Sequence, residues 1–211
     1  TVTGINDAPV AVNDTDSVNE DATVTRTSGS NLLMADDSDA DDDDSFTVTQ
    51  IAVTGSSNSA VSSGSSYNSS GTSVTGTYGT LTVGADGTYT YVADQSASDD
   101  LDLNDTATDS FTYTISDGDA TDTATLIFTV TGINDDPVAD NETGAVNEDA
   151  TLTVTDGTSD VLHGDTDADD SASLTVSAIR TGTEGGSGTA GSIGSGLTGT
   201  YGTLTLASDG T

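Results

Sequence analysis

Lysine is absent from the sequence, and the only basic residues are Arg26 and Arg180. They stand against 36 acidic side chains, so the formal net charge is −34 at pH 7. Because almost nothing in the chain can neutralise a phosphate, nucleic acid and anionic membranes are poor partners. Cysteine is also absent, which excludes disulfides and thiolate metal sites, and no apolar run approaches the length of a membrane span.

The sequence contains internal repeats. Three motifs return further along the chain: TVTGINDAP of 1–9 at 129–137 as TVTGINDDP, VNEDAT of 18–23 at 146–151, and GTYGTLTVGADGT of 76–88 at 199–211 as GTYGTLTLASDGT. The first two return at an offset of 128 and the third at 123, since five residues are missing from the Gly/Ser-rich segment of the second copy. A period of this length is typical of one globular domain per repeat.

We therefore predict the end of a preceding module and a linker at 1–9, a complete module at 10–137, and an incomplete second module at 138–211. Residue 211 corresponds to Thr88, so counterparts of the last strands of the complete module are not in the sequence. The first residues show no signal-peptide pattern. We expect a segment of a longer polypeptide; the alternative is a subunit whose open sandwich is completed by a neighbour's strands.

Apolar residues alternate with threonine in short runs. The runs 111–115 and 126–130 have apolar residues at every second position, and no segment keeps a helical period. Turn signals such as the Asp-Gly pairs at 86–87 and 117–118 separate such runs. We predict seven short antiparallel strands per repeat, near 10–17, 22–27, 46–54, 77–83, 88–92, 110–116 and 122–131. This pattern predicts an all-β fold of tandem immunoglobulin-like Greek-key β-sandwiches.

Strand geometry predicts that carboxylates gather at the two ends of each sandwich. Thirteen extended residues separate Asp7 from Glu20, a span of roughly 40 Å at about 3.3 Å per residue, so these two acids lie at opposite ends. Following the strands back and forth gives the members of each end. The first end gathers Asn6, Asp7, Asp37, Asp39, Asp41, Asp117 and Asp119. The second end gathers Glu20, Asn134, Asp135, Asp165, Asp167 and Asp169, and Glu148 repeats Glu20 in the second module.

Clustered carboxylates need a counter-ion. Two carboxylates 4 Å apart repel by about 4 kcal/mol at an effective dielectric near 20, and no basic residue is at hand. Oxygen-only ligands on loops favour Ca²⁺ over Mg²⁺ or a transition metal. The simpler reading is that acidic runs merely solvate loops. An EF-hand is not indicated, because its sixth position needs glycine, where Asp42 and Asp170 stand.

A family resemblance rests on the motifs INDxP, VNEDA, DxDADD, YGTLTxxxDGTYTY, DSFTYTISDG and TATLIFTVTGIND, which follow one another in this order. Together they resemble VCBS-type and related cadherin-like repeats of giant bacterial surface adhesins of the RTX type, over essentially the whole chain. In cadherin repeats, equivalent acidic positions bind calcium at module junctions. The resemblance implies as junction ligands Glu20, Asn134, Asp135, Asp165 and Asp167. The family's LDRE motif has no clean counterpart, with Asp99 or Asp100 nearest to it.

The resemblance also implies type I secretion, a place outside the cell or at the bacterial surface, and a role in attachment or biofilm. From the residues themselves no enzyme is predicted. His163 is the only histidine, and no base is placed to activate a serine. Paired carboxylates at the module ends lack an aromatic platform for a sugar, so a glycosidase is not indicated either.

Two functions of different class remain. The first is a calcium-stiffened stalk that spaces a distal binding domain from the cell, with neighbouring modules of the same chain as its partners. The second is a carbohydrate- or protein-binding module, or a self-associating fibril subunit, that acts through the Gly/Ser-rich segments 55–76 and 182–199. Lateral or head-to-tail contacts between chains fit either function, and a surface receptor or glycan would be bound by regions outside this chain.

Overall fold

The computed structural model describes residues 4–29, 32–41, 45–155, 157, 159–169, 171–183 and 185–211. The chain divides into two compact units, unit 1 (Thr1–Asn134) and unit 2 (Asp135–Thr211). Residues 1–3, which belong to the predicted preceding module, and the EF-hand positions Asp42 and Asp170 lie outside the described residues. Among the described residues no helix has the length and apolar character that a membrane span requires.

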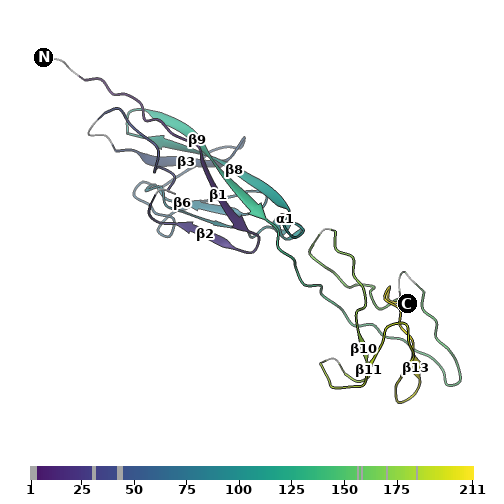
Figure 1. Ribbon diagram of the computed structural model, residues 1–211. Helices are drawn as coiled ribbons and strands as arrows, with labels where there is room; N and C mark the ends of the chain where they lie inside the picture. The colour runs from purple at the N-terminus through teal and green to yellow at the C-terminus, as the bar shows by residue number, and fades with distance from the viewer. Residues whose placement is uncertain are drawn as a thin grey trace. The chain divides into compact units, whose positions relative to one another are not determined.

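Unit 1 is a sandwich of two β-sheets (Figure 1). The five-stranded sheet has the order β1 (Asp14–Asn19), β9 (Thr121–Thr131), β8 (Thr106–Ser116), β3 (Thr47–Val53) and β4 (Ser59–Ala60). The four-stranded sheet has the order β2 (Thr23–Arg26), β7 (Tyr89–Val92), β6 (Thr80–Val83) and β5 (Thr72–Thr75). A single helical turn, α1 (Ser96–Asp99), follows β7. The all-β sandwich predicted from the alternating pattern is therefore confirmed.

The core lies between the two sheets and is built from the alternating residues of the long strands. β8 and β9 pair over eleven residues each, from Thr106 opposite Thr131 to Ser116 opposite Thr121. Their inward residues are fully buried: Phe111, Tyr113, Ile115, Leu126, Phe128 and Val130. The Phe128 ring stacks on Tyr91 of the other sheet with centroids 4.0 Å apart. Such contacts between large rings join the sheets across the core.

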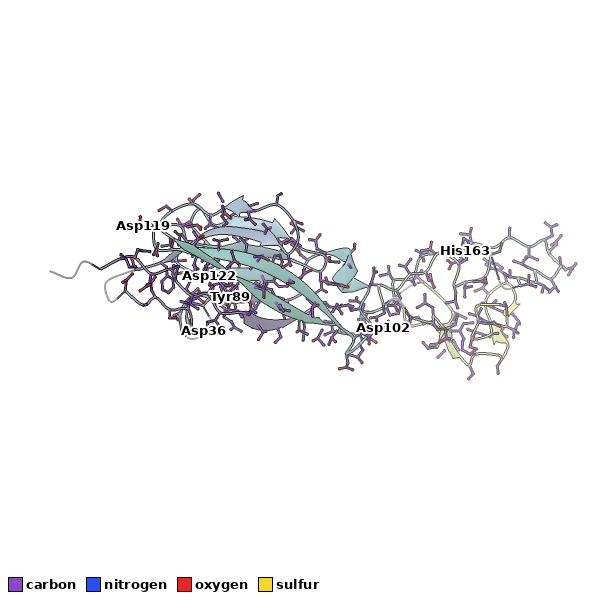
Figure 2. The ribbon with its side chains drawn as sticks, turned by 90° about the horizontal axis from the view of Figure 1, so that it is seen from above. Asp36, Tyr89, Asp102, Asp119, Asp122 and His163 are labelled. Atoms are coloured by element: carbon purple, nitrogen blue, oxygen red, sulfur yellow. The ribbon has the colours of Figure 1, made fainter. Side chains whose placement is uncertain are left out.

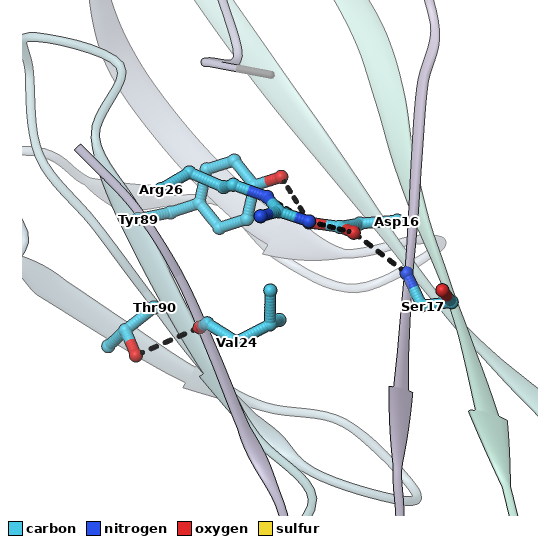
Figure 3. A network of polar contacts seen from close by, with 6 residues as sticks. All are labelled: Asp16, Ser17, Val24, Arg26, Tyr89 and Thr90. Atoms are coloured by element: carbon cyan, nitrogen blue, oxygen red, sulfur yellow. Dashed lines mark hydrogen bonds and ion pairs between the residues drawn. The ribbon is translucent and has the colours of Figure 1, made fainter. Parts of the chain in front are cut away.

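One ion pair also joins the two sheets. Arg26 at the end of β2 donates two hydrogen bonds to Asp16 of β1, with N–O distances of 2.8 and 2.7 Å. The Tyr89 hydroxyl of β7 donates to the same carboxylate at 2.9 Å (Figure 3). Because both of these guanidinium bonds go to Asp16, the one basic residue of unit 1 is already paired.

The strand predictions need several corrections. β1 begins at Asp14 and pairs in parallel with β9, so the prediction of antiparallel pairing throughout is wrong for this strand. Residues 10–12 instead bond to the loop of Asp37 and Ser38 and to Asp122 of β9, as described below. The strand predicted at 77–83 begins at Thr80, because a turn precedes it. The segment 55–76 is not only a loop, since it contains β4 and β5, and α1 was not predicted because four residues carry no periodic signal.

Unit 2 contains two short hairpins and much irregular backbone. One hairpin pairs β10 (Ile179–Arg180) with β11 (Ala190–Gly191), and the other pairs β12 (Leu197–Thr198) with β13 (Thr203–Leu204). Its two buried apolar side chains among the described residues are Leu197 and Leu206, each 8% exposed. Unit 2 thus has a much smaller apolar core than unit 1.

Candidate metal-binding pole

The loop that carries Asp37, Asp39 and Asp41 is fixed to the segment before β1. Val10 and Ser38 exchange two backbone hydrogen bonds, at 2.7 and 3.1 Å. Two residues further on, the Val12 N–H donates to Asp37 Oδ1 at 2.7 Å. Residues 10–12 are therefore held by this acidic loop, which explains why the regular strand starts only at Asp14.

Three segments that are distant in the sequence meet at this end of unit 1. The Asp7 N–H donates to Asp41 Oδ2 at 2.7 Å, and the Asp41 N–H donates to Asp39 Oδ1 at 3.0 Å. Asn6 Nδ2 donates to Asp117 Oδ2 at 3.1 Å, and the Asp119 N–H donates to Asp117 Oδ1 at 2.7 Å. We call the end formed by these residues the acidic pole; it comprises Asn6, Asp7, Asp37, Asp39, Asp41, Asp117 and Asp119.

The acidic pole lies at one end of the sandwich. Figure 2 shows Asp36, Asp119 and Asp122 at this end of unit 1 and Asp102 at the opposite end. Asp122 was not predicted as part of it, although its carboxylate accepts a hydrogen bond from the Ala11 N–H at 2.9 Å. The sequence signal was its place at the start of β9, opposite the turn that carries Asp117 and Asp119.

Two carboxylate oxygens of the acidic pole receive no hydrogen bond from the part of the chain that the structure describes. Asp37 Oδ2 and Asp39 Oδ2 are buried atoms, and no described residue donates a hydrogen bond to either. Buried polar atoms are ordinarily hydrogen-bonded, so oxygens without a donor need another positive partner. Oxygens of this kind, on loops fixed by their own backbone, have the donor chemistry that Ca²⁺ prefers.

The electrostatics around the pole show the cost of crowding carboxylates. The Tyr113 hydroxyl lies 2.9 Å from Asp14 Oδ2 and 2.8 Å from the Val12 carbonyl. Burial raises the pKa of Asp14 to about 7, with the charges of Asp36 and Asp37 adding to the shift and the Tyr113 hydrogen bond opposing it. Burial likewise raises the pKa of Asp37. Asp14 was not predicted as a member of this group.

The pKa of Asp117 is shifted in the opposite direction. A hydrogen bond from the Ala120 N–H, followed by those from Asn6 and the Asp119 N–H, lowers the pKa of its exposed carboxyl. The acidic pole therefore contains two kinds of carboxyl. Hydrogen-bond donors stabilise the anion of Asp117, whereas burial and nearby negative charges disfavour the anion of Asp37.

Unit 2 builds the same acidic loop at an offset of 128. The Asp135 N–H donates to Asp169 Oδ2 at 3.1 Å, and the Asp169 N–H donates to Asp167 Oδ1 at 3.1 Å. Val138 and Thr166 form the bridge that Val10 and Ser38 form in unit 1. Asp169 Oδ1 is buried and receives no hydrogen bond from the described residues. The loop geometry is thus a property of the repeat.

A further group of acids in unit 2 was predicted only in part. One ligand atom from each of Asp140, Glu142 and Asp165 lies within 4.8 Å of the others, close enough for one ion. The Asp140 N–H donates to Asp165 Oδ1 at 2.9 Å, as Val12 does to Asp37. A hydrogen bond with Asp140 raises the pKa of Glu142. Only Asp165 was among the predicted ligands, because Val12 occupies the position of Asp140 in the first copy.

The predicted second pole combines residues of both units. Glu20 is 1% exposed, and its Oε1 accepts a hydrogen bond from the Ile133 N–H within unit 1. Asn134 is exposed at the end of unit 1, and Glu148 is exposed in unit 2. The meeting of Glu20 and Asn134 with Asp165 and its neighbours across the junction stays a prediction, as does calcium ligation by all of these residues.

Asp109 is a buried carboxylate that was not predicted from the sequence. It is 4% exposed, and it accepts hydrogen bonds from the N–H groups of Thr77 at 2.8 Å, Tyr78 at 3.1 Å and Gly79 at 3.0 Å. The Tyr91 hydroxyl donates to it at 2.7 Å. One carboxylate thus accepts four hydrogen bonds, three of them from a single turn. Asp109 therefore holds this turn rather than an ion.

Comparison with known proteins identifies the class to which this sandwich belongs. The model of the bacterial cadherin-like domain matches residues 6–132, more than half of the chain. The chain therefore belongs to the bacterial cadherin-like domain family, whose β-sandwiches are typically structural rather than enzymatic modules found outside the cell or at its surface. The matched range includes the whole acidic pole of unit 1.

Other comparisons add little. No curated protein matches the chain. An NMR structure of a protein from Bacteroides thetaiotaomicron is 15% identical, with coverage of 59% of this chain and 89% of that one and a TM-score of 0.26. A likeness at that score carries no argument about fold or function.

Proposed function

We propose that the chain is a calcium-stiffened structural module of a large extracellular bacterial adhesin or surface fibre, which spaces a distal binding domain from the cell. The observation that supports this proposal is the acidic pole. There, hydrogen bonds join three acidic segments of unit 1, and two buried oxygens, Asp37 Oδ2 and Asp39 Oδ2, receive no hydrogen bond from the described residues.

Charge balance favours a divalent cation over a side-chain partner. Arg26 is bound to Asp16, and Arg180, the other basic residue, belongs to unit 2. Calcium takes six to eight oxygen ligands at about 2.3–2.6 Å, which suits carboxylates and amides on loops. In unit 1 the ligands would come from the acidic pole, and in unit 2 from the equivalent loop.

The place of the poles in the repeat supports a stalk. Each acidic loop is fixed to the segment that leads into its module, Val10 with Ser38 and Val138 with Thr166. An ion bound there would also bind the linker residues Asn6 and Asp7, or Asn134 and Asp135, and so would stiffen the connection to the preceding module. Attachment itself would then belong to regions outside this chain. The protein would leave the cell by type I secretion.

Small-angle X-ray scattering of residues 1–211 tests this function. With calcium we expect a larger maximum dimension and a narrower distribution of shapes than in chelator. Asp135→Asn should remove much of this difference by weakening the linker site, whereas Asp94→Asn, which removes the same charge from the end of β7, should preserve it. Identical profiles of the wild type in calcium and in chelator would contradict the stalk proposal.

A further inference from the structure

The first and last strands of unit 1 lie side by side and run in the same direction. β1 pairs in parallel with β9, from Asp14 opposite Leu126 to Asn19 opposite Thr131. β1 is an edge strand, so among the described strands β9 is its only hydrogen-bonded neighbour. The chain therefore enters this pair of strands at one end and leaves it at the other (Figure 1).

This arrangement decides how tension along the chain would act on unit 1. Tension pulls β1 toward its first residue and β9 toward its last residue, so the two strands are loaded in opposite directions along their length. The hydrogen bonds between them are then sheared together, whereas strands separated from one end lose one pair at a time. Resistance to forced unfolding depends on the unfolding rate, and a step that breaks many bonds at once is slow.

Side chains extend the attachment to residues before β1. The Ala11 N–H donates to Asp122 Oδ2 at 2.9 Å. Asn13 Oδ1 accepts hydrogen bonds from the N–H and the hydroxyl of Thr125, both at 2.9 Å. Asp122 and Thr125 both belong to β9. The attachment to β9 therefore begins before the backbone ladder does.

The attachment also continues after β1. The Glu20 N–H donates to the Thr131 carbonyl at 3.0 Å, and Glu20 Oε1 accepts a hydrogen bond from the Ile133 N–H. Glu20 is 1% exposed, so these bonds are shielded from water. We call residues 11–20 the strap, because they are bonded to β9 or to the residues just after it from Ala11 to Glu20.

One residue of the strap is fixed to the second sheet as well. The Asp16 side chain is 6% exposed, and it accepts two bonds from Arg26 of β2 and one from Tyr89 of β7 (Figure 3). Burial acts to raise the pKa of Asp16, but the hydrogen bonds from Arg26, the Ser17 N–H and Tyr89 lower it below the ordinary value. Asp16 is therefore an anion at neutral pH, and two parallel bonds between a guanidinium and a carboxylate are strong. Sliding the strap along β9 would break these two bonds.

This ion pair is not a property of the repeat. At an offset of 128, Gly144 and Val154 stand in place of Asp16 and Arg26. Neither Asp16 nor Arg26 is a predicted metal ligand. The attachment of the strap to the second sheet is thus a feature of unit 1 that the acidic loops do not explain.

We propose that unit 1 bears tension, with the strap and β9 acting as a shear clamp that the Asp16–Arg26 pair fixes to the second sheet. That tension acts along the chain rests on the proposed stalk function. The bonds of the clamp join protein atoms, so the clamp itself does not depend on calcium.

Single-molecule pulling on residues 1–211 in EGTA tests the clamp. The chain has no cysteine, so engineered cysteines attach the two handles at chosen, exposed positions. Ile5→Cys with Asp136→Cys pulls the strap and β9 in opposite directions, and unit 2 carries no load beyond residue 136. Ile5→Cys with Thr121→Cys instead pulls from the end at which both strands begin. At the same loading rate, we expect the first pair of handles to require about twice the unfolding force of the second, or more.

A variant of Arg26 tests the ion pair within the first pair of handles. Arg26→Met keeps an apolar stem and removes both bonds to Asp16, so at a fixed force it should unfold about tenfold faster. Thr90→Val is the matched control. It removes a hydroxyl bond to the Val24 carbonyl, which lies within one sheet (Figure 3), and should change the unfolding rate by less than about twofold.

A second variant keeps the proposal testable if Arg26→Met does not fold, which the missing rupture of full length would show. Asn13 is exposed, and Asn13→Ala removes the acceptor of both Thr125 bonds. At the same fixed force it should unfold about fivefold faster than the parent chain.

Equal unfolding forces for the two pairs of handles would overturn the clamp. So would unfolding of Asn13→Ala, and of any folded Arg26→Met, at the rate of the parent chain. These outcomes are separate from calcium binding: a Tm that calcium does not change would contradict the metal sites of the stalk, and the force difference in EGTA would remain.

Discussion

Individual carboxyls beside the acidic pole differ in the protonation state that the fold favours. Asp14 lies beside Tyr113, with Asp36 and Asp37 nearby, and burial raises its pKa to about 7. Asp122 accepts a hydrogen bond from the Ala11 N–H, which lowers its pKa. In the absence of a cation, the folded state therefore favours a proton on Asp14 and the anion at Asp122.

A pH dependence follows for Asp14 in calcium-free buffer. Its folded pKa lies above the ordinary value of 3.8, so the folded state binds the proton more tightly. The contribution of Asp14 to the free energy of unfolding therefore falls as the pH rises from about 4 to about 7, and then stays constant. Asp14→Asn keeps a neutral side chain at every pH. The Tm of this variant minus the Tm of the wild type should therefore increase as the pH rises across this range.

Asp122→Asn provides the control of opposite sign. Because the pKa of Asp122 is lowered, its stabilisation is present above the ordinary pKa and disappears as the pH falls. The Tm of Asp122→Asn should therefore fall behind the wild type as the pH rises. Parallel Tm curves for Asp14→Asn and the wild type would contradict the assignment of Asp14.

The residue types and spacing predicted much of the acidic pole but not the buried carboxylate of Asp109. Asp39 and Asp41 were found because they repeat and because strand reversal returns them to Asp7. Asp109 was missed although it occupies an inward position of the alternating pattern that continues through Phe111 and Tyr113. A charged residue at such a position indicates a buried carboxylate, but its donors belong to a turn that is 30 residues away in the sequence.

Among the elements, β8 joins the two polar sites of unit 1. Near its start Asp109 holds the turn before β6, and further along Tyr113 contacts Asp14 beside the acidic pole. Between them Phe111 packs in the aromatic core. The same strand therefore supplies a turn anchor, a core residue and a contact at the pole.

Asp109→Ala should destabilise unit 1 by about 3 kcal/mol, because it leaves the N–H groups of Thr77–Gly79 and the Tyr91 hydroxyl without their acceptor. Asp109→Asn keeps an acceptor oxygen and should cost less. Urea unfolding measures both, with the exposed Asp105→Ala as the control, expected within about 0.5 kcal/mol of the wild type. A similarly small effect of Asp109→Ala would refute the role of Asp109.

Long alternating strands were predictable, and strand boundaries set by tertiary contacts were not. β8 and β9 follow directly from the period of two, since each buries one face against the aromatic core. The start of β6 depends on the Asp109 turn, and the start of β1 depends on the Val10–Ser38 bridge. These are tertiary contacts, which no local pattern encodes.

At the scale of the whole molecule, charge is the dominant property. A net charge of −34 opposes any compact state, and the acidic loops of both units place carboxylates together instead of apart. The repetition of the same loop at an offset of 128 shows that this is part of the module's construction. Cations bound at these loops would offset part of the repulsion between their carboxylates.

The most direct test of calcium binding is the melting of residues 1–211 in excess EGTA and in calcium. A single site in unit 1 at 100 times its Kd adds about 2.7 kcal/mol to the free energy of unfolding, which corresponds to a rise in Tm of roughly 10 °C. Asp39→Asn with Asp41→Asn should abolish most of that rise, and Asp94→Asn should preserve it. We expect a lower Tm in EGTA that added calcium restores; superimposable melting curves in the two conditions would contradict calcium binding by this chain.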